Sequence, residues 1–230
     1  MIRFDRVTFF YRKGEPVFEG LDLEIGSGLT LVLGVNGSGK STLLKLAAGV
    51  EQPDAGAVFV GGRDLWKDEI AARRGLAYLP EFPDLSPYAT IGEICDFVSR
   101  LRGEPVARGK EALDVFGLGP YAHRSVRELS LGQKRRATFA AAWIGNPTHV
   151  LLDEPLEALD RKVREAALDW IFRLAGQGAA VLVVSHEIDP FLERAVRGVG
   201  LAGGRPTVVS PLPEQWADRA ALLENLARSG

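Results

Sequence analysis

The N-terminal part of the chain alternates between apolar and polar residues with the period of a half-buried β-strand. Its regularly spaced apolar positions are Ile2, Phe4, Val7, Phe9, Leu21, Leu23 and Ile25. The pattern predicts two antiparallel strands with a turn at Gly14-Glu15-Pro16 between them. Tyr11 lies at that turn, where composition alone favours a packing role for the aromatic ring.

Short apolar runs without alternation predict further strands. They occupy residues 30–33, 57–60, 75–79, 150–152 and 179–184. The runs at 150–152 and 179–184 are each followed by polar residues, which is typical of buried parallel strands that end at a ligand site. Residues 199–209 predict a hairpin that turns at Gly203-Gly204.

The middle of the chain has helical spacing instead. Thr90 and Glu93 match a capping box, and the apolar residues after them recur at helical intervals. A second helical segment ends at Gly117, and a third begins at Ser130. Two more helices are expected after this region, at 156–175 and 215–228.

Residues 34–42 follow an apolar strand, precede a helical pattern and contain G-x-x-x-x-G-K-S, which indicates a phosphate-binding loop. Glycines let the backbone approach a phosphate closely, and the positive end of the following helix faces the same anion. Lys40 supplies a charge for the β- and γ-phosphates, and the Ser41 hydroxyl suits Mg²⁺. The residues expected to bind nucleotide here are Asn36, Gly37, Ser38, Gly39, Lys40, Ser41 and Thr42.

The loop defines the expected fold class, an α/β P-loop NTPase core with an antiparallel β subdomain and an inserted α-helical subdomain. The core is expected to take residues 1–83 and 146–230, and the helical subdomain about 84–145. Together they form one domain over residues 1–230.

Two of the predicted strands end in residues that suit ATP hydrolysis. Asp153 ends the strand that could lie beside the phosphate loop, and its carboxylate suits Mg²⁺, directly or through water. Glu154 is placed to accept the proton of an attacking water. His186 follows the strand at 179–184, and its ring could hydrogen-bond the γ-phosphate.

Composition excludes several other classes of protein. A net charge of −2 gives no electrostatic drive toward nucleic acid, and we expect no direct nucleic-acid partner. The basic run Lys134-Arg135-Arg136 is expected to be a solvated helix face, and the single Cys95 a core residue. Apolar runs stay far below the ~20 residues that span a bilayer, so a soluble protein is expected, with any membrane contact through a partner.

With these motifs in order, the chain resembles the ATP-binding subunit of an ABC transporter over nearly its whole length. Residues 129–133 match the family signature L-S-G-G-Q except at Leu131, and 151–155 are similar to the Walker B strand with its catalytic Glu. Residues 158–160 resemble the D-loop, and His186 the switch histidine. The resemblance also makes Tyr11 the aromatic residue that stacks on adenine, against the packing interpretation.

The resemblance implies an ATPase that uses ATP and Mg²⁺, with Lys40, Glu154 and His186 as catalytic residues. Ser130, Gly132 and Gln133 would face the γ-phosphate of ATP bound to the other subunit of a dimer. That dimer is a homodimer or a heterodimer with another ABC ATPase. A separate polytopic membrane subunit is the further partner, which implies a cytoplasmic protein at the inner face of the cell membrane.

Two positions depart from the family pattern. Leu131 replaces the first signature glycine, and Glu81 stands where the family usually has the Q-loop Gln. We expect Glu81 to join Ser41 and Asp153 around the metal. The stretch Tyr78-Leu79-Pro80-Glu81 resembles ATPase subunits of ABC-2-type exporters, which favours export. A soluble ABC ATPase not coupled to transport and a nucleotide-dependent regulator with weak hydrolysis remain as alternatives.

Overall fold

The computed structural model describes residues 1–228 of the chain. These residues divide into two compact units. Unit 1 comprises Met1–Tyr78, Pro147–Glu154 and the described residues from Leu174 onward, and unit 2 comprises Leu79–Asn146 and Pro155–Arg173. Within the described range, no helix has the length and apolar character needed to cross a bilayer.

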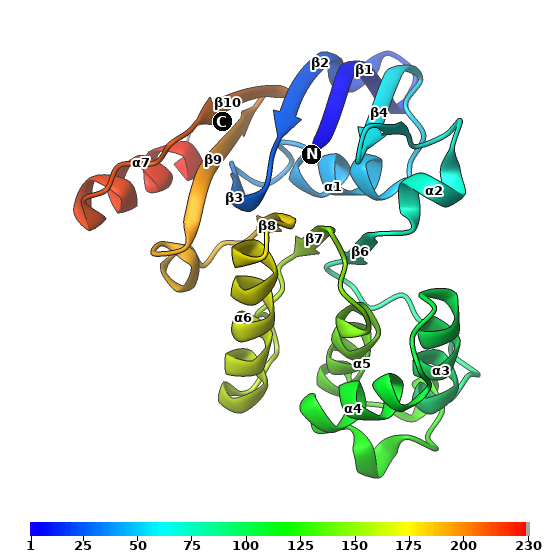
Figure 1. Cartoon of the computed structure of the whole chain (residues 1–230). Helices are drawn as coiled ribbons and strands as arrows, with labels where there is room; N and C mark the ends of the chain where they lie inside the picture. Colours follow the sequence, from blue (N-terminus) through cyan, green and yellow to red (C-terminus); the bar gives the residue numbers. More distant parts are fainter. Residues whose placement is uncertain (229–230) are drawn as a thin grey trace. The chain divides into compact units, whose positions relative to one another are not determined.

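Unit 1 contains a four-stranded sheet in the order β2-β1-β4-β5 (Figure 1). Its strands are β1 (Ile2–Arg12), β2 (Glu15–Ile25), β4 (Ala55–Val60) and β5 (Arg63–Asp64). The predicted antiparallel pairing of β1 with β2 is confirmed, although the turn is shorter than expected because Arg12 already pairs with Glu15. Tyr11 therefore lies within β1.

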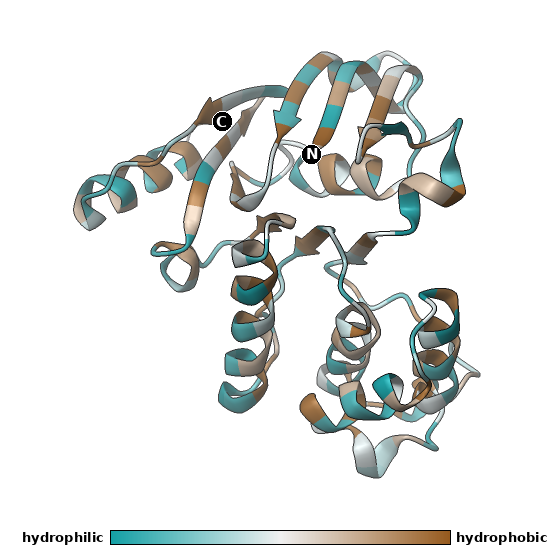
Figure 2. Cartoon of the chain, in the orientation of Figure 1, coloured by the Kyte–Doolittle hydropathy of each residue, from teal (hydrophilic) through white to brown (hydrophobic). Residues whose placement is uncertain are grey.

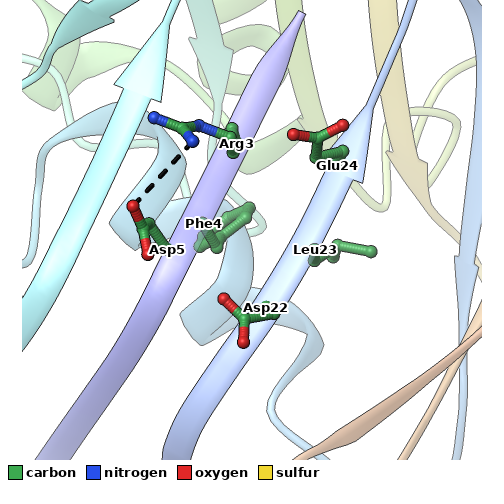
Figure 3. Close-up of a pocket in the computed structure, with 6 residues that line it drawn as sticks. All are labelled: Arg3, Phe4, Asp5, Asp22, Leu23 and Glu24. Carbon is green, nitrogen blue, oxygen red and sulfur yellow. Dashed lines mark ion pairs between the residues drawn. The ribbon is translucent and has the colours of Figure 1, made fainter.

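Alternation along β1 and β2 separates a buried face from a charged one, as the banded colouring of these strands shows (Figure 2). Phe4 pairs with Leu23 on the buried face, and Arg3 pairs with Glu24 on the other. A shallow hollow of about 330 Å³ on this sheet is lined by these residues together with Asp5 and Asp22 (Figure 3). Arg3 lies 3.9 Å from the carboxylate of Asp5, so part of the charge in the hollow is already paired.

The second sheet has six strands in the order β10-β9-β3-β8-β7-β6. They are β3 (Gly28–Leu33), β6 (Leu76–Leu79), β7 (His149–Asp153), β8 (Ala180–Val184), β9 (Ala195–Ala202) and β10 (Arg205–Val209). Strands β3, β8 and β7 run parallel, as expected for buried strands, and β9 with β10 forms the predicted hairpin. Strand β8 lies between β7 and β3, so the strand that ends in Asp153 pairs with β8 and not with the strand that precedes the phosphate loop.

Helix α1 (Lys40–Ala48) shares one core with both sheets. This core includes Phe4 from β1, Leu43 from α1, Leu151 from β7 and Leu182 from β8. The short α2 (Glu69–Arg73) and the terminal α7 (Trp216–Arg228) complete unit 1. Burial of the first turn of α1 holds the phosphate loop in a fixed position on the sheet.

Unit 2 is helical, with α3 (Ile91–Leu101), α4 (Ala107–Val115), α5 (Leu131–Trp143) and most of α6 (Arg161–Gly176). Two short 3₁₀ helices, η1 (Gly119–Tyr121) and η2 (Val126–Glu128), lie between α4 and α5, and η3 (Asp189–Phe191) belongs to unit 1. The helix expected at 156–175 begins later than predicted, and most of it clusters with unit 2 rather than with the core.

Aromatic side chains form the centre of unit 2. The Phe116 and Phe139 rings stack at 5.4 Å, and Phe139 meets Trp170 edge-on at 6.2 Å. Cys95 is 1% exposed, and burial raises the pKa of its thiol to about 12. The expectation that Cys95 is a core residue is confirmed.

Candidate functional site

The glycines of residues 34–42 adopt backbone conformations that other residues rarely do. Gly34 has φ 146° and Gly39 has φ 99°. Neither position has room for a side chain. A Cβ at Gly34 would lie 2.5 Å from the Leu201 carbonyl oxygen, and one at Gly39 would lie 2.9 Å from the Phe18 ring. The loop therefore needs glycine at both positions for conformation as well as for room.

Lys40 and Ser38 point their polar atoms into this loop. The Lys40 ammonium donates hydrogen bonds to the carbonyl oxygens of Gly34, at 2.7 Å, and Val35, at 2.9 Å. The Ser38 hydroxyl is buried without a hydrogen-bond partner among the described residues. A buried donor beside a buried cation, both at the N-terminus of a helix, fits an anion such as a phosphate.

Tyr11 lies beside the loop, near the first turn of α1. Thr42 donates a hydrogen bond of 3.4 Å to the Tyr11 hydroxyl, and the Tyr11 ring contacts Phe9 edge-on at 4.9 Å. Tyr11 is nevertheless 53% exposed. Packing explains one edge of the ring, and the exposed part remains available to a planar group.

The ends of β7 and β8 hold the two carboxylates and the histidine predicted from the sequence. Asp153 is 2% exposed and pairs with Val184 on β8. Glu154 follows with φ 47°, a left-handed conformation that is uncommon for a residue with a side chain. The carboxylate of Glu154 accepts hydrogen bonds from the His186 backbone N–H at 3.1 and 3.2 Å, and the His186 ring lies 3.6 Å away.

Glu154 has the electrostatic character of a general base. Burial raises the pKa of Glu154 above its ordinary value of 4.5, and the charge of Asp153 acts in the same direction. The hydrogen bond from His186 and the His186 ring lower the pKa in part. A carboxylate with a raised pKa is a stronger proton acceptor than an ordinary surface glutamate.

The remaining predicted site residues lie in unit 2 and are not placed relative to unit 1. Ser130 caps α5 by accepting a hydrogen bond from the Gln133 N–H, and the Gln133 side-chain oxygen accepts one from the Ser130 N–H. Leu131, the departure from the family pattern, is 64% exposed. Glu81 lies in the loop before α3, so a metal role for Glu81 stays a prediction.

The expectation for the basic run 134–136 is wrong. Arg135 is 3% exposed and donates hydrogen bonds to the carbonyl oxygens of Pro80 and Glu81. Arg136 pairs with Asp160 at 2.7 Å. The sequence carries a signal for this: Arg135 precedes the buried Phe139 by four residues, which places both on the same face of α5.

Comparison with known proteins agrees with this geometry. Residues 18–157 match the family described as ABC transporter. The chain is 36% identical to a nickel import ATP-binding protein of Rhodobacter capsulatus, covering 94% of this chain and 91% of that protein. It is 34% identical to a taurine import ATP-binding protein of Pseudomonas aeruginosa, covering 94% and 84% respectively.

A solved structure has the same fold. It is the dimeric, post-hydrolysis state of an ATP-binding cassette bound to ADP and Pi, with a TM-score of 0.80. Sequence identity is 27%, and the match covers 93% of this chain and 100% of that one. The chain belongs to the ABC transporter family as an ATP-binding subunit, an ATPase whose cofactors are ATP and Mg²⁺.

Proposed function

We propose that the chain works as a dimer around two Mg-ATP molecules and drives transport through a separate polytopic membrane subunit. The observation that carries the hydrolytic part is the position of Glu154, whose partly buried carboxylate follows β7 and is held by the His186 backbone. The phosphate loop and this carboxylate belong to the same unit, and the elements beside them, α1 and β7, contribute to its core.

Each residue has a separate task in this proposal. The phosphate loop, with Lys40, holds the β- and γ-phosphates, while Ser41 and Asp153 hold the metal. Bound Mg²⁺ supplies neutralisation of charge on the phosphate oxygens. Glu154 accepts a proton from the attacking water, because a carboxylate that holds one N–H still has lone pairs to accept another. The His186 ring contacts the γ-phosphate.

Dimerisation follows from the division of the site. Ser130, Gly132 and Gln133 begin a thirteen-residue helix whose N-terminus favours an anion. They would contact the γ-phosphate of the ATP held by the other subunit, and the cassette compared above forms a dimer. We therefore propose that two subunits, identical or different, close around ATP.

Tyr11→Ala is expected to weaken ATP, ADP and GTP binding together, by roughly 5- to 100-fold each. Stacking on an aromatic ring is worth about 1–3 kcal/mol and tolerates any base. Calorimetric titration of the three nucleotides measures the effect, with Tyr11→Phe as the matched control that keeps the ring. A loss of thermal stability at unchanged affinity would return Tyr11 to a packing role.

Unit 2 offers a surface for the membrane subunit. Phe97 and Leu101 lie one turn apart on α3 and are 61% and 68% exposed. Phe82 and Tyr88, in the loop before α3, are 72% and 78% exposed. Large apolar side chains exposed in this number on one unit are typical of a protein that binds a partner.

The double variant Phe97→Asp, Leu101→Asp should no longer capture a polytopic membrane protein from detergent-solubilised membranes of the native host. Basal ATPase activity should change less than about twofold, because both side chains are exposed. Ile70→Asp, at an exposed apolar position on α2 of unit 1, is the control. Capture of no membrane protein by the unmodified chain would favour a soluble ABC ATPase, and absent turnover would favour a regulator.

The relatives bear on the direction of transport. The expectation of export rested on the stretch at Glu81 alone, and the comparisons do not support it. Both relatives named above are import proteins, so we propose import as the direction these comparisons favour. A position on the cytoplasmic side of the membrane, held there by the membrane subunit, completes the proposal.

A further inference from the structure

Residues 80–89 form an irregular loop that leads into α3 and belongs to unit 2. Pro80, Pro83 and Pro87 restrict its backbone, since each fixes its own φ. Phe82 and Tyr88 are the exposed aromatic side chains of the loop. Because the backbone of this loop is restricted, a displacement of its exposed aromatic side chains is passed to the residues that hold the loop in place.

Arg135 makes the first anchor. One terminal nitrogen, Nη1, donates hydrogen bonds to the carbonyl oxygens of two successive residues, Pro80 and Glu81. The arginine is 3% exposed, so protein acceptors rather than water must satisfy its charge. Charge-assisted bonds of this kind are stronger than neutral ones, and they fix the first peptide of the loop to α5.

Backbone hydrogen bonds make the second anchor, at the other end of the loop. The Arg127 N–H donates to the Pro87 carbonyl, and the Val126 N–H donates to the Ala89 carbonyl, both at 3.0 Å. The Arg127 guanidinium also lies 5.6 Å from the Tyr88 ring. Val126 and Arg127 belong to η2, which directly precedes Leu129 and Ser130 of the signature.

The N-terminal half of α5 is fixed on a further side within unit 2. Arg136 pairs with Asp160, and a Cβ at Gly132 would lie 3.5 Å from the Ala158 carbonyl oxygen. The loop, η2 and the start of α5 are therefore joined by contacts at both ends of the loop and at the helix itself. The side chain whose removal would separate loop from helix is Arg135.

We propose that Arg135 is a positioning residue that fastens loop 80–89 to the signature helix, so that the membrane subunit displaces Ser130 when it displaces Phe82. The identity of the displacing partner rests on the proposed function. The attachment of the loop to α5 by Arg135 does not rest on the proposed function, because every contact that supports it lies within unit 2.

The single cysteine makes the fastening measurable. Cys95 is buried, and its thiol is unreactive at neutral pH because burial raises its pKa to about 12. A Phe82→Cys variant therefore accepts a nitroxide label at the loop alone. Adding Arg135→Met should shorten the rotational correlation time of that label at least about twofold, because a loop freed at one end gains nanosecond motion.

Three comparisons separate positioning from general loosening. Lys134→Met, the neighbouring partly exposed cation, should leave the label unchanged, and Arg135→Lys should loosen it less than Arg135→Met does. A nitroxide at Val106→Cys, before α4, should report no change in the Arg135→Met protein. An unchanged label mobility at position 82 in the Arg135→Met protein, or equal loosening at positions 82 and 106, would overturn the proposal.

If Arg135→Met does not fold, the comparison of Arg135→Lys with Lys134→Met replaces it: equal label mobility at position 82 in these two proteins would overturn the proposal. Because the chain is measured without nucleotide or partner, failure here leaves the transport proposal standing.

Discussion

Glu154→Gln is expected to lower ATP turnover at least ~10²-fold, the usual scale for loss of a general base. The amide keeps the shape of the side chain and can still accept from the His186 N–H, but it cannot take a proton from water. ATP should still bind, so the protein should accumulate as an ATP-bound dimer. Phosphate release at saturating Mg-ATP measures the first effect, and sedimentation with and without ATP measures the second.

A matched control and the pH dependence of turnover test whether the effect is specific to Glu154 as the general base. Glu165→Gln removes a carboxylate that is exposed on α6 and paired with Arg161, so turnover should stay normal. In the unmodified protein the base acts only when deprotonated, so turnover should fall as the pH drops through the raised pKa of Glu154. The residual activity of Glu154→Gln should lack that step. Near-normal turnover in Glu154→Gln would assign the base to another residue.

Local patterns in the sequence predict most of the fold. Alternation specifies β1 and β2 because their outer face meets water, and the continuous runs specify β7 and β8 because both faces are covered. The capping boxes at Thr90 and Ser130 mark helix starts because they satisfy orphan N–H groups within four residues of chain. In each case the cause and its signal lie in the same short segment.

Strand order could not be predicted in the same way. Nothing local in the sequence shows that β8 lies between β7 and β3. The connections between these strands are long enough to allow either order, and the apolar run of each strand is the same in both. Only the packing of the whole sheet distinguishes the two arrangements.

In the candidate site too, features that depend on neighbouring residues in the sequence are predicted, and features that depend on distant residues are not. The phosphate loop is local in sequence, so its motif predicts glycines that the structure holds at positive φ. Arg135 is different, because charge favours a solvated position while helical spacing from Phe139 favours a buried one. The acceptors that decide between them, at Pro80 and Glu81, are 55 and 54 residues away in sequence. Composition alone cannot supply such partners.

Lys40→Ala is expected to lower the affinity for Mg-ATP at least ~10²-fold, because a hydrogen-bonded charge on a buried phosphate is worth several kcal/mol. The structure adds a second role. The Lys40 ammonium donates hydrogen bonds to the Gly34 and Val35 carbonyls at 2.7 and 2.9 Å, so it also closes the loop. Removing it should lower the free energy of unfolding by about 1–3 kcal/mol, since those carbonyls lose a buried partner.

The loss of Mg-ATP affinity and the loss of stability can be measured separately, and together they test the assignment of residues 34–42 as a phosphate loop. Calorimetric titration with Mg-ATP gives the affinity, and urea unfolding without nucleotide gives the stability. Lys45→Ala is the matched control: it removes the same side chain five residues further along α1, where the ammonium lies 5.8 Å from the centre of the Tyr11 ring. It should lower affinity by less than about tenfold, through weaker support of Tyr11 alone. If Lys40→Ala lost stability and kept its affinity, residues 34–42 would be a structural turn closed by a lysine, and the phosphate-loop assignment would be wrong.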